Sequence, residues 1–119
     1  MKQLQNVESL ALGGNLVSLL DKVGNGEHFT IMIYGFSSTQ NKKLEEIPTL
    51  VLGIEIGKEK HLVITRSAGL LDQFKRLEHA GELEKQEKMS GHLQQQKFEK
   101  DGDSRTTWKF VVDLPEDLF

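Results

Sequence analysis

The sequence of 119 residues contains no cysteine. This absence excludes disulfide bonds, a thiolate nucleophile and a zinc site built on cysteine, and it fits a reducing compartment. Long apolar runs are absent too. One of the longest is "TLVLGI", whereas a helix that crosses a bilayer needs about 20 apolar residues. We therefore expect a chain that does not span a membrane.

Targeting and catalytic patterns are also missing. The start "MKQLQNVESL" lacks the apolar core of a secretory signal, so we expect the chain to stay in the cytoplasm. "GNGEH" and "GGN" lack the GK[ST] of a phosphate loop, and no Ser/His/Asp set or carboxylate pair can be singled out. The histidines have no metal-ligand spacing such as HExxH; they are His28, His61, His79 and His92. We predict a protein that is not an enzyme and holds no metal or cofactor.

The composition is that of one globular domain, with 37% apolar and 28% charged residues. The net charge of −3 argues against a surface that attracts nucleic acid everywhere. Acidic residues gather in "LEEIP", "EHAGELEKQE" and "DLPEDLF", whereas five cations lie between residues 88 and 109. A polyanion would respond to this local positive charge.

Most segments read as strands. Paired glycines at 13 and 14 suggest one long, bent strand in the first 23 residues, and a second strand is expected at 29–36. Residues 37–48 are polar, end at a proline and predict a loop. Then "TLVLGIEI" and "HLVITRS" flank the turn "GKEK". A helix follows, capped by Ser67 and ended by Gly81. The last two strands, near 85–98 and 105–113, join through "EKDGDS".

Alternation along these strands indicates which rings could be exposed. Tyr34 and Phe36 lie on the face opposite Phe29, so they would line either a groove or a subunit interface if Phe29 faces the core. Trp108 shares the more apolar face of the last strand, which favours the core. Phe98 shares a polar face and is the better candidate for an exposed ring.

The segment "SGHLQQQKFEKDGDSRTTWKFVV" resembles the last two strands of bacterial and phage single-stranded DNA-binding proteins. In that family a glycine-led polar strand ends in a basic residue and an aromatic, a Gly/Asp turn follows, and an arginine opens the next strand. The residues of this sequence that match this pattern are Gly91, Lys97, Phe98, Gly102 and Arg105. "LALGGNLV" resembles the opening strand of the family, and "HLVITRSAGLLDQFKRLEHAGELEKQEKMSGHL" resembles its third strand, helix and the start of its fourth strand. "TLVLGIEI" is an additional strand.

The resemblance implies an all-β fold with one helix, a five-stranded Greek-key OB-fold barrel with an extra strand or hairpin. It also implies binding of single-stranded DNA with little sequence preference during replication or recombination, by a dimer or tetramer in the cytoplasm of a bacterium, or of a bacterial host if the chain is phage-encoded. Rings for base stacking and cations for phosphates are then expected at Phe98, Tyr34, Phe36, Trp108, Lys88, Lys97, Lys100 and Arg105.

The C-terminus resembles the acidic tip with which family members recruit replication and recombination proteins. We divide the chain into a barrel domain at 1–112 and a short acidic tail at 113–119. The expected contacts of the tail are Asp113, Glu116, Asp117 and Phe119. A polar chain end with one packed ring explains these residues equally well. Two other functions stay open for the whole chain, a protein-interaction module and an RNA-binding barrel.

Overall fold

The protein is mostly β, as its sequence predicts. The computed structural model describes residues 1–3, 17–40 and 42–113. In this part of the chain the elements are, in order, β1 Lys2–Gln3, β2 Val17–Ser18, α2 Leu19–Lys22, β3 His28–Gln40, β4 Glu46–Ile56, β5 Glu59–Thr65, α3 Ala68–His79, α4 Glu82–Lys85, β6 Met89–Lys100 and β7 Asp103–Val112. The single predicted helix is thus joined by two helices of four residues each, α2 and α4.

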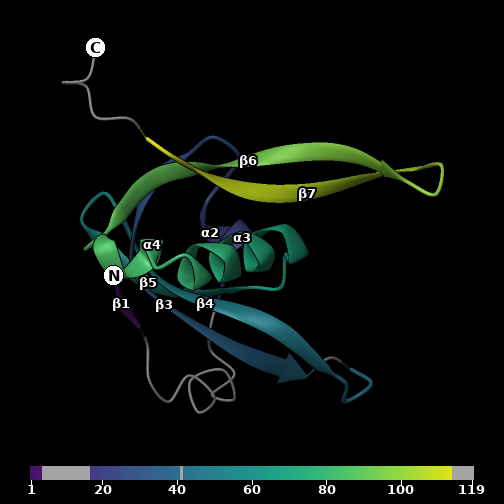
Figure 1. Ribbon diagram of the computed structural model, residues 1–119, viewed down its shortest axis with the longest axis horizontal. Helices are drawn as coiled ribbons and strands as arrows, with labels where there is room; N and C mark the ends of the chain where they lie inside the picture. The colour runs from purple at the N-terminus through teal and green to yellow at the C-terminus, as the bar shows by residue number, and fades with distance from the viewer. Residues whose placement is uncertain (4–16, 41, 114–119) are drawn as a thin grey trace.

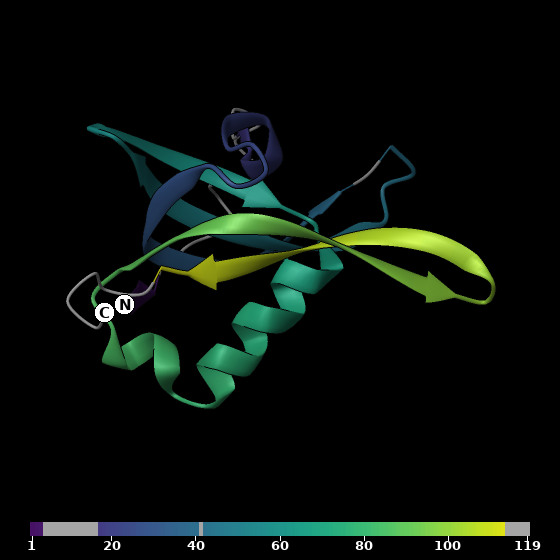
Figure 2. The same ribbon diagram turned by 90° about the horizontal axis from the view of Figure 1, so that it is seen from above.

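The described strands form one curled sheet. Its order is β2-β5-β4-β3-β6-β7, and β1 pairs with β3 beside this path. β3, β4 and β5 form an antiparallel meander, while β6 pairs antiparallel with the start of β3 and with β7. Figures 1 and 2 show the β3–β4 and β6–β7 hairpins projecting from the same side of the molecule. The pairings of the described residues leave β2 and β7 as edges, so closure into a Greek-key barrel stays a prediction.

The hairpin turns lie where the sequence predicts them. Gly57, between β4 and β5, has a φ of +61°. Between β6 and β7, Asp101 and Gly102 have φ values of +55° and +82°. Two positive φ angles in a two-residue loop are those of a type I′ turn, whose twist matches that of the strands it joins. This turn sets the register in which Phe98 lies opposite Arg105.

The long helix α3 has the predicted ends. The Leu70 N–H donates to the Ser67 hydroxyl at 3.4 Å, and Gly81 follows the helix with a φ of +75°. Leu70, Leu71 and Phe74 form its buried stripe. In Figure 1 the helix lies between the two projecting hairpins, and it contacts both β4 and β7. The helix therefore packs against one side of the curled sheet, where it contacts β4 and β7 (Figure 2).

The edge of β7 is covered by α3. The Gln73 side chain accepts a hydrogen bond from the Phe110 N–H at 2.8 Å and donates one to the Phe110 carbonyl at 2.7 Å. One turn earlier, Gly69 lies so close that a Cβ atom there would be 2.2 Å from the Thr107 hydroxyl and 2.6 Å from the Trp108 carbonyl oxygen. Glycine is required for this approach, and the edge is closed over residues 107–110.

A bulge in β3 changes which of its side chains face the core. The register against β4 shifts between Ile31 and Ile33, so Met32 is an extra residue in this strand. Phe29 and Ile31 are buried before the bulge, and Tyr34 is buried after it. Strict alternation would place Tyr34 on the outer face. The prediction of two uninterrupted faces was therefore wrong, because one extra residue reverses the alternation.

The predicted bent strand at the start is corrected in its described part. Gly13 and Gly14 lie outside the described residues, as does most of that segment. Residues 19–22 form the helical turn α2 instead, closed by a hydrogen bond of 2.9 Å from the Val23 N–H to the Leu19 carbonyl. Leu19 and Val23 are both buried. Their spacing of four residues suits one face of a helix, which explains the turn.

The predicted loop at 37–48 is shorter than expected. β3 continues to Gln40 and β4 begins at Glu46, although both ends are polar. Pro48 lies inside β4, opposite Ser38. Proline lacks an N–H but is tolerated where a strand has a neighbour on one side only. This is the case here, because β5 pairs with β4 only from Leu50 onward.

One hydrophobic core joins the long elements. Its buried members are Leu19, Val23, Phe29, Ile31, Tyr34, Leu50, Leu52, Ile54, Val63, Leu70, Leu71, Phe74, Leu83, Met89, Leu93 and Phe110. The part of β6 and β7 that carries residues 94–106 extends beyond this core and is exposed. None of the described helices is long and apolar enough to cross a membrane.

Candidate functional site

A pocket of about 650 Å³ lies beside the projecting part of the β6–β7 hairpin. We call it the aromatic pocket. It is formed by this hairpin, the junction between β5 and α3, and the segment that contains β2 and α2. The residues that line it are Ser18, Leu20, Ile64, Thr65, Arg66, Ser67, Ala68, Phe98, Arg105, Thr106, Thr107 and Trp108.

Two aromatic rings from neighbouring strands line the pocket. Phe98 is 42% exposed, so its ring is accessible to a ligand. Trp108 is half-buried because one side of it packs against the core. It is the only tryptophan in the sequence. Both rings line the pocket, but the register pairs Phe98 with Arg105 and Gln95 with Trp108, so the two rings start from opposite faces of the hairpin. Phe98 is the more exposed of the two and the better candidate for base stacking.

Two arginines give the pocket a positive charge. Arg105 lies directly opposite Phe98 in the register of β6 and β7. Arg66 comes from the β5–α3 junction, where its Nε donates to the Thr39 hydroxyl at 2.7 Å and its terminal nitrogen donates to the Gln40 carbonyl at 3.2 Å. These bonds hold the guanidinium in place and leave other N–H donors of its five for a ligand.

The pocket has no carboxylate among its described lining residues. This contrasts with the chain as a whole, whose net charge is −3. Two guanidinium groups without a nearby acidic partner in the lining would attract an anion, and phosphate and carboxylate are the anions whose geometry the planar, multiply donating group matches. Apolar rings beside cations therefore define a place for a ligand that is both flat and negatively charged.

The structure brings three of the predicted contacts together and separates the others. Phe98, Trp108 and Arg105 line the aromatic pocket. Lys97 and Lys100 are exposed on the same hairpin, but Lys97 alternates to the face opposite Phe98. Lys100 lies at the turn, opposite Asp103. These two lysines are within the same projecting hairpin without lining the pocket.

Lys88 and Phe36 lie elsewhere. Lys88 precedes β6, at the end of the strand remote from Phe98. Phe36 is half-buried and packs against the core, with its ring centroid 5.8 Å from that of Tyr34 in an edge-to-face arrangement. Neither residue lines the aromatic pocket.

Tyr34 is a core residue, so the prediction that it stacks on a base is corrected. Its side chain is only 2% exposed. Burial, followed by a hydrogen bond to the Glu78 carboxylate, raises the pKa of Tyr34 to about 12. The bulge at Met32 is the reason, because it turns Tyr34 inward.

Asp113, the first residue of the predicted tail, contacts the sheet. Its backbone N–H donates to the Ser90 carbonyl at 2.8 Å, and its carboxylate contacts His28 and His92. These contacts, with the hydrogen bond from His28 as the largest cause, lower the pKa of the Asp113 carboxyl. The other predicted tail contacts lie outside the described residues; they are Glu116, Asp117 and Phe119.

Sequence reasoning missed Arg66. The residue lies at the junction between β5 and the helix cap Ser67. Its approach to Thr39 and Gln40 depends on where β3 ends, 26 residues earlier in the sequence. That distance is why no local pattern could place it beside the aromatic pocket.

Comparisons with models of known protein families, with curated proteins and with solved structures give no match for this chain. A ligand for the aromatic pocket can therefore be proposed only from the shape and chemistry of the pocket itself. The features that matter are the exposed ring of Phe98, the half-buried ring of Trp108, two guanidinium groups and the lack of a carboxylate in the described lining.

Proposed function

We propose that this protein binds single-stranded DNA with little sequence preference and does so through the aromatic pocket. The observation that carries the proposal is the meeting of Phe98, Trp108, Arg66 and Arg105 in one pocket without a carboxylate in its described lining. Unpaired bases offer flat faces for the rings, and the phosphates between them offer charge for the arginines. Stacking accepts every base, so recognition of sequence is expected to be weak.

The order of the strands supports an OB-type barrel as the scaffold. That fold is a five-stranded Greek-key barrel. Here the five long strands are ordered β5-β4-β3-β6-β7, with α3 between β5 and β6 along the chain. In this interpretation β3, β4 and β5 are the first three barrel strands, and α3 covers the opening beside β7. "TLVLGIEI" is then part of the barrel meander and not an insertion.

The resemblance to single-stranded DNA-binding proteins is the basis for also proposing a role in DNA replication or recombination. Such a protein protects unpaired strands and works as a dimer or tetramer. Asp113 and the residues after it would contact replication or recombination proteins. The aromatic pocket supports only the binding of the nucleic acid.

The test is a titration of the protein with oligo(dT), followed by fluorescence. Because Trp108 is the only tryptophan, any quenching reports directly on the aromatic pocket. We expect saturable quenching. Replacing Phe98 with alanine should weaken binding roughly 5- to 140-fold, because stacking contributes about 1–3 kcal/mol per base and 1.4 kcal/mol is tenfold in affinity.

Val112→Ala is the matched control, since Val112 is also an exposed apolar residue of the hairpin, at 47%, but lies outside the pocket. It should bind as tightly as the unmodified protein. An unchanged affinity of Phe98→Ala, or no binding of oligo(dT) at low salt, would contradict the proposal. If oligo(U) competes as strongly as oligo(dT), the pocket binds RNA as well as DNA, because stacking on a base does not depend on the sugar.

A further inference from the structure

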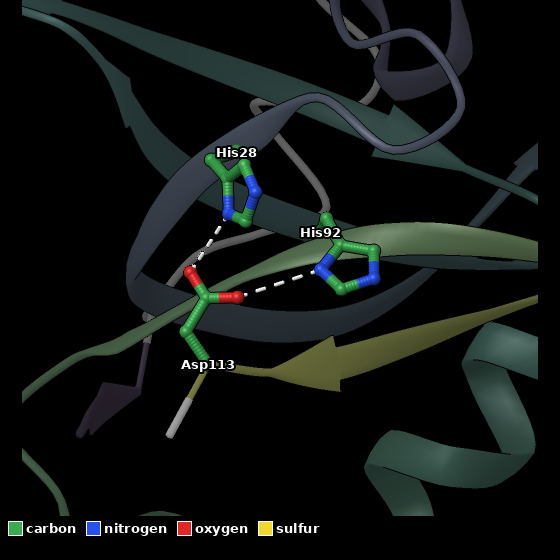
Figure 3. A group of neighbouring side chains, drawn as sticks. All are labelled: His28, His92 and Asp113. Carbon is green, nitrogen blue, oxygen red and sulfur yellow. Dashed lines mark hydrogen bonds and ion pairs between the residues drawn. The ribbon is translucent and has the colours of Figure 1, made fainter. Parts of the chain in front are cut away.

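Three polar side chains meet at the end of the sheet remote from the aromatic pocket. They are His28, the first residue of β3, His92 in β6 and Asp113, which follows β7 (Figure 3). His28 lies directly opposite His92 in the antiparallel pairing of β3 and β6. The sequence pattern gave no sign of this group, because 64 and 21 residues separate successive members. Only the strand register brings them together.

Both imidazole rings direct the same nitrogen, Nδ1, at the carboxylate. The Nδ1 atom of His28 is 2.9 Å from Oδ2 of Asp113, and that of His92 is 3.4 Å from Oδ1. All three ligand atoms lie within 4.8 Å of one another. Bonds of about 2.0–2.2 Å to a tetrahedral ion place its ligands roughly 3.3 Å apart, so small rotations of these side chains would close the set around one ion.

The backbone holds the three residues in place. His28 and His92 are fixed by the ladder between β3 and β6. The Asp113 N–H is fixed by its hydrogen bond to the Ser90 carbonyl. Beside the group, the hydroxyls of Thr30 and Ser90 are 2.9 Å apart and bond to each other. Ligands on a rigid sheet lose little conformational entropy when an ion binds, which favours affinity.

We propose that His28, His92 and Asp113 form a binding site for one Zn²⁺ ion. Two neutral imidazoles and one carboxylate match the preference of zinc and suit Ca²⁺ or Mg²⁺ poorly, since those ions take oxygen ligands. The side chain of His28 is 68% exposed, so water can occupy the fourth coordination position. The ion would link the start of β3 to the end of β7.

This site is independent of the proposed nucleic-acid binding. His92 precedes Phe98 by six residues on the same strand, which is about 20 Å at roughly 3.3 Å per residue. Loss of zinc should therefore leave the affinity for oligo(dT) unchanged. The two proposals can fail separately.

The experiment is a calorimetric titration of the full chain, free of any histidine tag, with Zn²⁺. We expect one ion per chain. His28→Ala and His92→Ala should each weaken zinc binding at least about tenfold, because even outer partners of a metal ligand contribute about 10- to 100-fold. At one fixed concentration, added Zn²⁺ should raise the unfolding temperature of the unmodified protein more than that of either variant.

His61→Ala is the matched control. His61 also contacts a carboxylate, with 3.3 Å between its Nε2 and Glu59, but it has no second histidine in that pair. It should bind zinc as the unmodified protein does. Thermal unfolding in the presence of a chelator checks that every variant is folded, and exposed His28 is the safer substitution. The proposal is overturned if zinc does not bind saturably, or if His28→Ala binds it as tightly as His61→Ala.

Discussion

The ionisation of Tyr34 is a sharp test of the core arrangement around the bulge in β3. Tyr34 is the only tyrosine, so the absorbance of its phenolate can be followed without interference from another tyrosine. Burial and the hydrogen bond to Glu78 raise its pKa from 10.0 to about 12. Raising the pH is the perturbation. We expect the phenolate to form about 2 pH units later in the folded protein than in the protein unfolded in urea.

The same difference predicts how stability depends on pH. Below about pH 10 the phenol is neutral in both states, so it contributes no pH dependence. Between about pH 10 and 12 the unfolded state loses the proton while the folded state keeps it. The free energy of unfolding should therefore fall across this window. A pKa difference of about 2 corresponds to about 2.7 kcal/mol, at about 1.36 kcal/mol per pH unit.

Tyr34→Phe isolates this effect, because other groups also titrate at high pH. The difference in the free energy of unfolding between the unmodified protein and Tyr34→Phe should be constant below about pH 10 and then change by about 2.7 kcal/mol up to about pH 12. Urea unfolding at a series of pH values measures it. Formation of the phenolate near pH 10 with an intact circular dichroism signal would refute a buried Tyr34.

Two further predictions concern the contact between α3 and β7, both measured by urea unfolding. Gly69→Ala should lower the free energy of unfolding by about 1–3 kcal/mol, since its Cβ would lie 2.2 Å from the Thr107 hydroxyl. Gly24→Ala, whose Cβ would meet its nearest atom at 3.7 Å, should be close to neutral, and equal effects at the two glycines would contradict the packing. Gln73→Ala should cost about 1–3 kcal/mol, because it leaves the Phe110 backbone groups without their partners. An unchanged stability would show that water replaces Gln73.

The features that sequence predicted well are set by a few neighbouring residues. Ser67 caps the start of α3 and Gly81 follows its end, and each acts through residues within one helical turn. Asp101 and Gly102 form a tight turn because both can adopt positive φ. Phe98 is exposed as alternation along β6 predicted, although both faces of this strand are exposed from Gln94 onward. In each of these cases the decisive interaction spans only a few positions of the chain.

The features that sequence missed depend on contacts between distant segments. The extra residue Met32 reversed the faces of β3, and nothing in the local pattern "TIMIYGF" distinguishes a bulge from a regular strand. Arg66 reaches the end of β3 through tertiary contacts. The meeting of His28 and His92 requires the register between β3 and β6. The pattern of a single sequence reflects interactions between neighbouring residues. Strand pairing and register depend on contacts between segments that are distant in the sequence.

The salt dependence of oligo(dT) binding is the most direct test of the central claim. If the two arginines of the pocket each neutralise one phosphate, the slope of log affinity against log salt should be about −1.4 or steeper, at roughly −0.7 per contact for a single strand. Arg105→Ala should reduce the slope by about 0.7, while Lys75→Ala on α3 should leave it unchanged. A slope near zero, or the same slope for Arg105→Ala and the unmodified protein, would contradict the claim that the aromatic pocket binds the phosphates of an unpaired strand.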